Sequence, residues 1–184
     1  KYANSVTPIF DIVQQIGGHI FVHPGRRPDE VPKSYQNLKK PFIDFPAERL
    51  ALNVQHNVSH AMVTLLFSNF LDSYSDVSLH IANLGGTFPM VIERMDNVSL
   101  TRTPDKALPS SKTNRFHVDC SSLGPRAIEL AVAVFGAEKV VFGTDCPIFS
   151  TERSIMALKE ANIEDTDKEL ILNKNASEIL SKCD

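Results

Sequence analysis

The sequence predicts an α/β protein whose sheet is parallel, and two observations support this. Four short apolar runs have the length and composition of buried strands, and each is followed by turn residues and then by a segment with helical spacing. Strands that are apolar along their length and separated by helices are typical of a parallel sheet that helices cover. The four runs are HIFVH (19–23), VSLHIA (77–82), RFHVD (115–119) and KVVFG (139–143).

Helical spacing begins before the first run, in the segment TPIFDIVQQIGG (7–18). Ile9, Ile12, Val13 and Ile16 fall on one face of this segment, and two glycines end it, as is common at the end of a helix. Further helices are predicted over 57–74, 85–95, 124–136 and 150–162, the last with Ser150 or Thr151 as its N-cap.

A long irregular loop is predicted after the first strand, because the stretch from Pro24 to Pro46 holds five prolines and several charges. The chain has 184 residues, of which 42% are hydrophobic, and this is enough for one domain with a real core. We therefore expect a single domain over residues 1–184.

Charge and composition exclude several classes of protein. The formal net charge of −3 is too close to neutral for a nucleic-acid surface, and the Lys and Arg residues are mostly scattered. No apolar run approaches the roughly 20 residues of a membrane span, and the N-terminal residues lack the layout of a signal peptide. The three cysteines form no CxxC pair, which favours a reducing compartment. We expect a cytoplasmic protein with neither a nucleic-acid nor a membrane partner.

Polar residues stand at the ends of the predicted strands. His23 closes the first run, Asn83 follows the second, Asp119 closes the third, and Asp145 lies just past the fourth. In parallel α/β folds the loops after the strands converge on one face and hold the chemistry. A carboxylate there can bind a metal or move a proton. Burying an ionised Asp without a partner would cost several kcal/mol of folding free energy. Asp145 is therefore a candidate for a metal site or a catalytic group.

Three strings taken together resemble the C-terminal half of the metal-dependent amidohydrolase-2 family, which includes aminocarboxymuconate semialdehyde decarboxylase and related aromatic-acid decarboxylases. The strings are FVHP (21–24), NLGGTFPMVIERM (83–95) and VVFGTDCP (140–147), and the segment 59–79 fits the helix that precedes the family's H-x-G-G element. Each string alone is weak. Their order and spacing make the resemblance fairly specific, and it covers nearly the whole chain.

The resemblance implies a (β/α)8 TIM barrel with one divalent metal, usually zinc with manganese as the alternative, at its C-terminal mouth. The family's metal ligands fall on His23 and Asp145, and its substrate-binding arginine falls on Arg94. These residue types suit the chemistry, since His and Asp are normal zinc ligands and Arg can bind a substrate carboxylate through two hydrogen bonds.

Two departures from the family pattern stand out. The chain has no His-x-His, the family's source of two more ligands, and four strands make only half of an eight-stranded barrel. The other half must come from a missing N-terminal segment, another polypeptide or another copy, and homo-oligomerisation would cover the exposed strand edges.

The second departure is Asn83, which replaces the catalytic His and cannot shuttle a proton near neutral pH. His80 lies three residues before Asn83, so regular strand alternation predicts that its side chain points to the opposite face of the sheet from that of Asn83.

For several other residues the sequence allows either a functional or a purely structural role. Asp119 either orients a ligand or loop or only ends its strand, and His117 is more often a core histidine than a ligand. Gly85 and Gly86 open a helix and either bind a phosphate or allow close packing. His56 and His60 are i, i+4 neighbours that favour a solvent-facing helix.

The resemblance implies a metal-dependent decarboxylase of a small carboxylated aromatic or cyclic substrate, with Asp145 and position 83 in the catalytic site. Two alternatives remain open. One is hydrolysis of a lactone or amide, and the other is a non-catalytic relative that keeps the fold and binds a ligand or partner.

Overall fold

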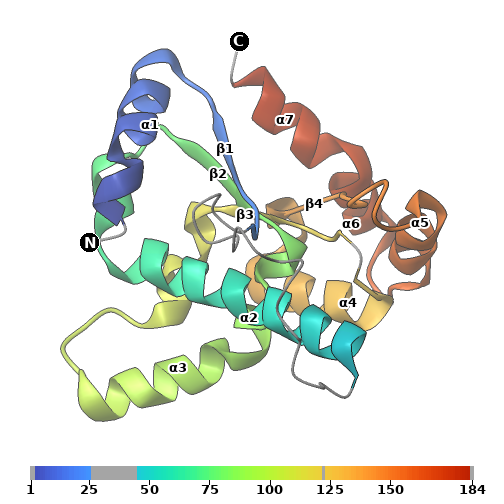
Figure 1. The fold of residues 1–184 in the computed structure, drawn as a ribbon, viewed down its shortest axis with the longest axis horizontal. Helices are drawn as coiled ribbons and strands as arrows, with labels where there is room; N and C mark the ends of the chain where they lie inside the picture. The colour runs from blue at the N-terminus through green and yellow to red at the C-terminus, as the bar shows by residue number, and fades with distance from the viewer. Residues whose placement is uncertain (1–2, 26–44, 122, 183–184) are drawn as a thin grey trace, which may run out of the picture.

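The computed structural model describes residues 3–25, 45–121 and 123–182, and its centre is a parallel sheet of four strands (Figure 1). The strands lie in the order β1-β2-β3-β4, so each pairs with its neighbour in the sequence. Register places Phe21 beside His80, His80 beside His117, and Asp119 beside Val141. The four predicted strands and their parallel arrangement are confirmed. Their bounds are His19–Val22, Ser78–Ile81, His117–Asp119 and Val140–Val141.

Helices connect the strands and follow the last one, as predicted for an α/β protein (Figure 1). Ser150 caps its helix as predicted, because its Oγ accepts a hydrogen bond from Arg153 N at 3.4 Å. Of the predicted loop over 24–46, residues 26–44 lie outside the described residues. The helices are α1 (Ala3–Ile16), α2 (Pro46–Phe67), α3 (Phe88–Arg102), α4 (Pro125–Phe135), α5 (Thr151–Glu160), α6 (Asp165–Glu169) and α7 (Asn175–Ser181).

Two helical regions differ from the prediction. Helix α2 begins at Pro46 rather than at residue 57, and it ends at Phe67, after which Asn69 takes a left-handed conformation with φ of 58°. A short 3-10 helix, Phe70–Ser73, completes the predicted segment. Helices α6 and α7 were not predicted, and a π-helical turn over Leu170–Lys174 joins them.

The core lies between one face of the sheet and the helices beside it. In β2, Leu79 and Ile81 are buried in this core, together with Met62 of α2 and Phe88 of α3. Ser78 and His80 alternate with them and are only half-buried. We call the face that carries His80 the inner face of the sheet. Helices therefore cover the outer face, and polar side chains are left on the inner one.

The two ends of the sheet are covered to different extents, and α1 and α7 lie at opposite ends (Figure 1). On α1, Phe10 and Val13 pack against the core. The other predicted apolar positions point outward, with Ile9 58%, Ile12 57% and Ile16 74% exposed. At the β4 end, Phe142 N donates to Ile171 O at 2.8 Å, so the C-terminal helical region covers this strand. Across the described ranges, no helix has the length and apolar character needed to cross a membrane.

Candidate active site

A cavity of about 390 Å³ lies over the inner face of the sheet and the carboxyl ends of its strands. The four polar residues predicted at the strand ends, His23, Asn83, Asp119 and Asp145, all line it. Apolar walls come from β1, from the end of β4 and from α7. The cavity thus brings together the predicted metal ligands and the predicted catalytic position.

Asp145 sits in a tight turn directly after β4. Its φ of 56° places it in the left-handed region, which Asp tolerates better than most residues. Its carbonyl oxygen accepts hydrogen bonds from Ile148 N at 2.9 Å and Phe149 N at 3.2 Å, which close the turn. The side chain is half-buried and faces the cavity. The backbone therefore holds this carboxylate at the mouth of the sheet.

His23 follows β1 and reaches the same cavity from the other end of the sheet. Its ring is exposed and meets Phe21 edge to face, with ring centroids 5.4 Å apart. Imidazole nitrogen and carboxylate oxygen both suit zinc or manganese, so the donor types at His23 and Asp145 fit a divalent metal. Within residues 3–25, 45–121 and 123–182, no group of three His, Cys, Asp or Glu could hold a metal ion. The described chain therefore supplies at most part of a ligand set.

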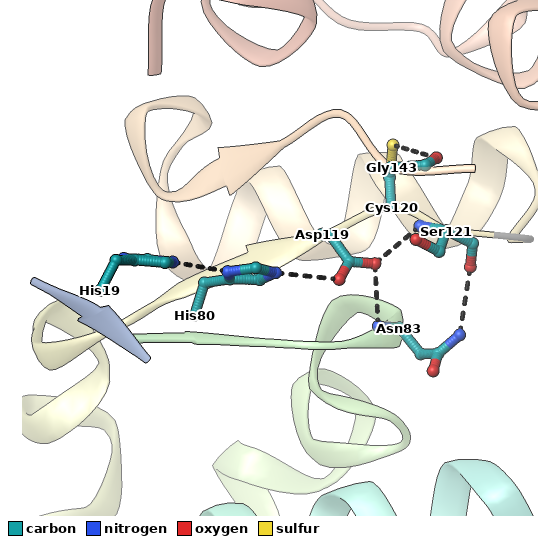
Figure 2. A network of polar contacts seen from close by, with 7 residues as sticks. All are labelled: His19, His80, Asn83, Asp119, Cys120, Ser121 and Gly143. Atoms are coloured by element: carbon teal, nitrogen blue, oxygen red, sulfur yellow. Dashed lines mark hydrogen bonds and ion pairs between the residues drawn. The ribbon is translucent and has the colours of Figure 1, made fainter. Parts of the chain in front are cut away.

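Asn83 is buried in a 3-10 turn, Asn83–Gly85, immediately after β2. Its backbone N donates to Asp119 Oδ1 at 3.2 Å, and its amide Nδ2 donates to Ser121 O at 3.3 Å (Figure 2). Its φ of 56° suits asparagine, one of the few residues that enter the left-handed region readily. Asn83 thus bridges the ends of β2 and β3.

Asp119 is the centre of the polar contacts at the strand ends. Its Oδ1 accepts from Asn83 N and also from Ser121 N at 3.0 Å, and its Oδ2 lies 3.4 Å from His80 Nε2 (Figure 2). Burial by itself raises the pKa of this carboxyl, but the hydrogen bonds from His80, Ser121 and Asn83 outweigh it, so the net pKa is lowered. Asp119 is therefore ionised at neutral pH although it is almost fully buried.

The prediction that His80 points away from the site is wrong. His80 lines the same cavity as Asn83, because the regular alternation of the strand ends at Ile81 and Asn83 lies beyond it in the left-handed turn. His80 Nδ1 lies 2.6 Å from His19 Nε2, and its ring stacks on Phe21 with centroids 4.0 Å apart. Burial and the neighbouring His80 lower the pKa of His19 to about 4.

Arg94 lies apart from these residues. It is exposed on α3 and lines a second cavity, of about 780 Å³, between α2, α3 and the segment that follows α3. Lys106 and Lys112 also line this second cavity, whereas His23, Asn83 and Asp145 do not. The structure therefore brings together three of the four predicted site residues and places the fourth elsewhere.

Comparison with known proteins decides the family. The model of the amidohydrolase-2 family, described as amidohydrolase, matches residues 1–182. The chain belongs to the amidohydrolase-2 family. It is also 26% identical over 188 residues to the 2-amino-3-carboxymuconate-6-semialdehyde decarboxylase of Dictyostelium discoideum, covering 96% of this chain and 48% of that protein.

Solved structures show the same fold at lower identity. The 5-carboxyvanillate decarboxylase of Sphingomonas paucimobilis is 18% identical with a TM-score of 0.71, over 95% of this chain and 52% of that one. The IDCase of Metarhizium anisopliae is 20% identical with a TM-score of 0.76, over 98% and 53%. The chain spans about half the length of these relatives. The chain therefore has the fold of about half of an amidohydrolase-2 TIM barrel.

The structure bears on two interpretations that the sequence left open, those of the glycine pair and of His117. Alanine at Gly86 would place its Cβ against Gln55 O and 2.8 Å from Ser59 Oγ, which favours the close-packing reading of the glycine pair. His117 is half-buried and lines a cavity with Lys139 rather than the one that holds His23 and Asp145. The chain of contacts through His19 and His80 was missed, since no family motif covers these two positions.

Proposed function

We propose that this chain forms the C-terminal half of the active site of a metal-dependent decarboxylase that acts on a small carboxylated aromatic or cyclic substrate. The observation that carries this proposal is the single cavity that holds His23, Asn83, Asp119 and Asp145 at the strand ends. Relatives named as decarboxylases, among them a 2,6-dihydroxybenzoate decarboxylase, support the choice of reaction.

His23 and Asp145 would hold the metal. Zinc suits these donors, and manganese is the metal named for the dihydroxybenzoic acid decarboxylase of Polaromonas sp. JS666. A bound divalent metal would draw electron density from substrate oxygens and so favour the change in charge at the ring. Two ligands bind a metal weakly, so the remaining ligands come from the other half of the barrel, whether that half lies in a longer chain or in another copy.

The other residues of the chain would bind the substrate and exclude water. Phe21, Val141 and Phe142 give the cavity apolar walls that can pack against a ring. Arg94 would bind a carboxylate through two hydrogen bonds. Because Arg94 lies outside the cavity, it would do so in a site that a second copy completes. Protonation of the ring carbon would precede loss of carbon dioxide.

The experiment is a decarboxylation assay of the purified chain with 2,6-dihydroxybenzoate and 5-carboxyvanillate, with manganese or zinc supplied. We expect carbon dioxide release that needs the metal and falls by at least about 10³-fold in Asp145→Ala, because a metal ligand is lost. Asp105→Ala, which removes an exposed carboxylate outside the cavity, is the matched control. Metal-independent release, or equal rates in the two variants, would contradict the proposal.

A second candidate, a non-catalytic relative, is favoured by one observation. The amide of Asn83 is turned to Ser121 O, so position 83 joins two strand ends and supplies no acid or base. This candidate predicts no turnover in the wild type and none in Asn83→His. Hydrolysis of a lactone or amide by the same metal site would appear as turnover of an ester or amide without carbon dioxide release. The cytoplasmic location stays part of the proposal, supported by Cys120 and Cys146 being free thiols.

A further inference from the structure

We propose that His19, His80 and Asp119 form one proton-carrying chain that supplies the acid and base of the cavity, in place of the histidine that position 83 lacks. This inference rests on the proposed decarboxylation and names the group that would protonate the substrate. It requires three contacts in series, a proton that can occupy them in more than one arrangement, and access from the cavity.

The contacts run in line across three strands (Figure 2). His19 on β1 meets His80 on β2 through Nε2 and Nδ1 at 2.6 Å, and His80 Nε2 faces Asp119 Oδ2 on β3 at 3.4 Å. His19 Nδ1 lies 2.8 Å from Ser78 Oγ, which ends the series. The rings of His19 and His80 are tilted by only 17° from one another, so the two ring planes are nearly parallel. Parallel pairing of β1, β2 and β3 fixes the order of the three side chains.

Two proton arrangements satisfy every contact in this series. In the first, both rings are neutral: His80 donates Nε2–H to Asp119, and His19 donates Nε2–H to His80 Nδ1. In the second, His80 is an imidazolium that donates to Asp119 and to His19 Nε2, and His19 then donates Nδ1–H to Ser78. The two arrangements differ by one proton and need no movement of the backbone. The series can therefore store one proton.

The surroundings favour storage of that proton on His80. Asp119 is ionised and buried, so it favours a positive charge on the ring that faces it. Burial and the neighbouring His80 lower the pKa of His19 to about 4, so His19 stays neutral and acts as the acceptor. His117 on β3, with its pKa also lowered to about 4 by burial and by Lys139, stays neutral beside His80. His23 and Asp145 also line this cavity, as its predicted metal ligands.

The three residues of this series are accessible from the cavity. His19, His80 and Asp119 all line it, and the His80 side chain keeps 17% of its surface exposed. His19 is half-buried on the first strand of the sheet, and rotation of its ring would free His80 Nδ1–H toward a substrate. Asn83 contributes by donating its backbone N–H to Asp119 Oδ1, which leaves Oδ2 for His80.

The proton balance is simple. The Nδ1–H bond of the His80 imidazolium breaks, its electron pair stays on nitrogen, and the proton forms a C–H bond at the carboxylated ring carbon. The bond from that carbon to the carboxylate then breaks, its electrons return to the ring, and carbon dioxide leaves. Neutral His80 regains a proton from water through His19. One proton is consumed for each carboxylate converted, and no oxidant or reductant is needed.

The first test is NMR of the wild-type chain labelled with 15N at histidine. We expect a scalar coupling across the hydrogen bond between His19 Nε2 and His80 Nδ1, because the two nitrogens lie 2.6 Å apart. Absence of the coupling between about pH 5 and pH 8 overturns the proton-carrying chain.

The second test is kinetic. His80→Gln is expected to lower kcat by about 10² to 10⁴-fold with KM and metal content unchanged, because an acid–base group is lost. Asp119→Asn is expected to lower kcat with KM unchanged, since the carboxylate that faces His80 Nε2 is gone. His60→Gln, on the exposed face of α2, is the matched control.

The outcomes separate this inference from the proposed function. Metal-dependent turnover that His80→Gln leaves intact overturns the inference and keeps the decarboxylase. Absence of turnover in the wild type overturns the decarboxylase, and the NMR coupling then decides alone whether the residues share a proton. An unfolded His80→Gln does not block the test, because the NMR measurement uses the wild-type chain.

Discussion

The two cavities differ in how the chain builds them. The cavity at the strand ends is framed by a sheet, and its polar groups are held by buried hydrogen bonds from Asn83 and Ser121 to Asp119. The larger cavity lies between helix surfaces, and its cations are Arg94, Lys106 and Lys112. Strand ends thus provide fixed geometry for proton and metal chemistry, whereas a helix surface provides charge that can meet a carboxylate from outside. Gly86 lies between β2, which contributes to the first cavity, and α3, which contributes to the second, and its backbone packs against Gln55 and Ser59 of α2.

Gly86→Ala is expected to damage both cavities and to have the largest effect. The backbone at Gly86 has a φ of +68°, and an added Cβ would meet Gln55 O and Ser59 Oγ of α2. We expect the free energy of unfolding to fall by about 3 kcal/mol or more, measured by urea denaturation. The control is Gly124→Ala, where no atom lies within 4 Å of the added Cβ. That change is expected to cost less than about 1 kcal/mol. Equal losses in the two variants would contradict the packing role of Gly86.

Asn175→Ala is expected to weaken only the cavity at the strand ends. Its buried amide Nδ2 donates to Ala137 O at 2.8 Å and to Val140 O at 2.7 Å, which holds α7 against β4. Losing both bonds leaves buried carbonyls without this donor, so we expect a loss of about 2 kcal/mol in unfolding free energy. Asn173→Ala, on the exposed side of the same helical region, should change it by less than about 0.5 kcal/mol. A small effect at Asn175 would mean that α7 is held by its apolar contacts alone.

Arg94→Ala is expected to change substrate binding and to leave metal content unchanged. Loss of a charged hydrogen bond to a carboxylate raises KM by about 10 to 100-fold, equivalent to roughly 1.5–3 kcal/mol. Because Arg94 and Asp145 line different cavities, a mixture of Arg94→Ala and Asp145→Ala should regain part of the wild-type rate. No recovery, with both variants folded, would show that Arg94 does not act across copies.

Low pH is expected to lower the free energy of unfolding modestly, through histidines on the inner face of the sheet. The pKa values of His19 and His117 are lowered to about 4, so the unfolded chain binds protons first as pH falls below about 6.5, and stability falls from there toward pH 4. Both rings are partly exposed, so the loss between pH 7 and pH 5 should be on the order of 1 kcal/mol. Urea midpoints at the two pH values measure it. His19→Gln should flatten this dependence, and a dependence that stays the same would contradict the account.

Much of the fold could be predicted because buried parallel strands leave a plain signal. Apolar runs locate all four strands, and the first polar side chains after each run locate the residues at their ends. The predicted start of α2 is too late, because Pro46 belongs to a proline-rich stretch that favours a loop, although proline is well tolerated in the first turn of a helix. Helices α6 and α7 were missed. The π-helical turn between them breaks the 3.6-residue period on which helix prediction depends.

The site was harder to predict because two of its features depend on tertiary geometry. Strand alternation placed His80 on the wrong face relative to Asn83, since the left-handed turn after Ile81 resets the direction of the chain. The family resemblance assigned Arg94 to substrate binding, but the packing of α3 places this residue at the second cavity. Neither the turn nor the packing leaves a periodic signal in the sequence.

The most direct test of the central claim, that the strand ends form a metal site, is the metal content of the purified chain. Elemental analysis of the wild type and of Asp145→Ala should find about one zinc or manganese per wild-type chain and far less in the variant, as expected when a ligand is removed. That result would also mean that the ligands absent from the described residues come from another segment or copy. No bound metal in either protein, or the same amount in both, would contradict the claim.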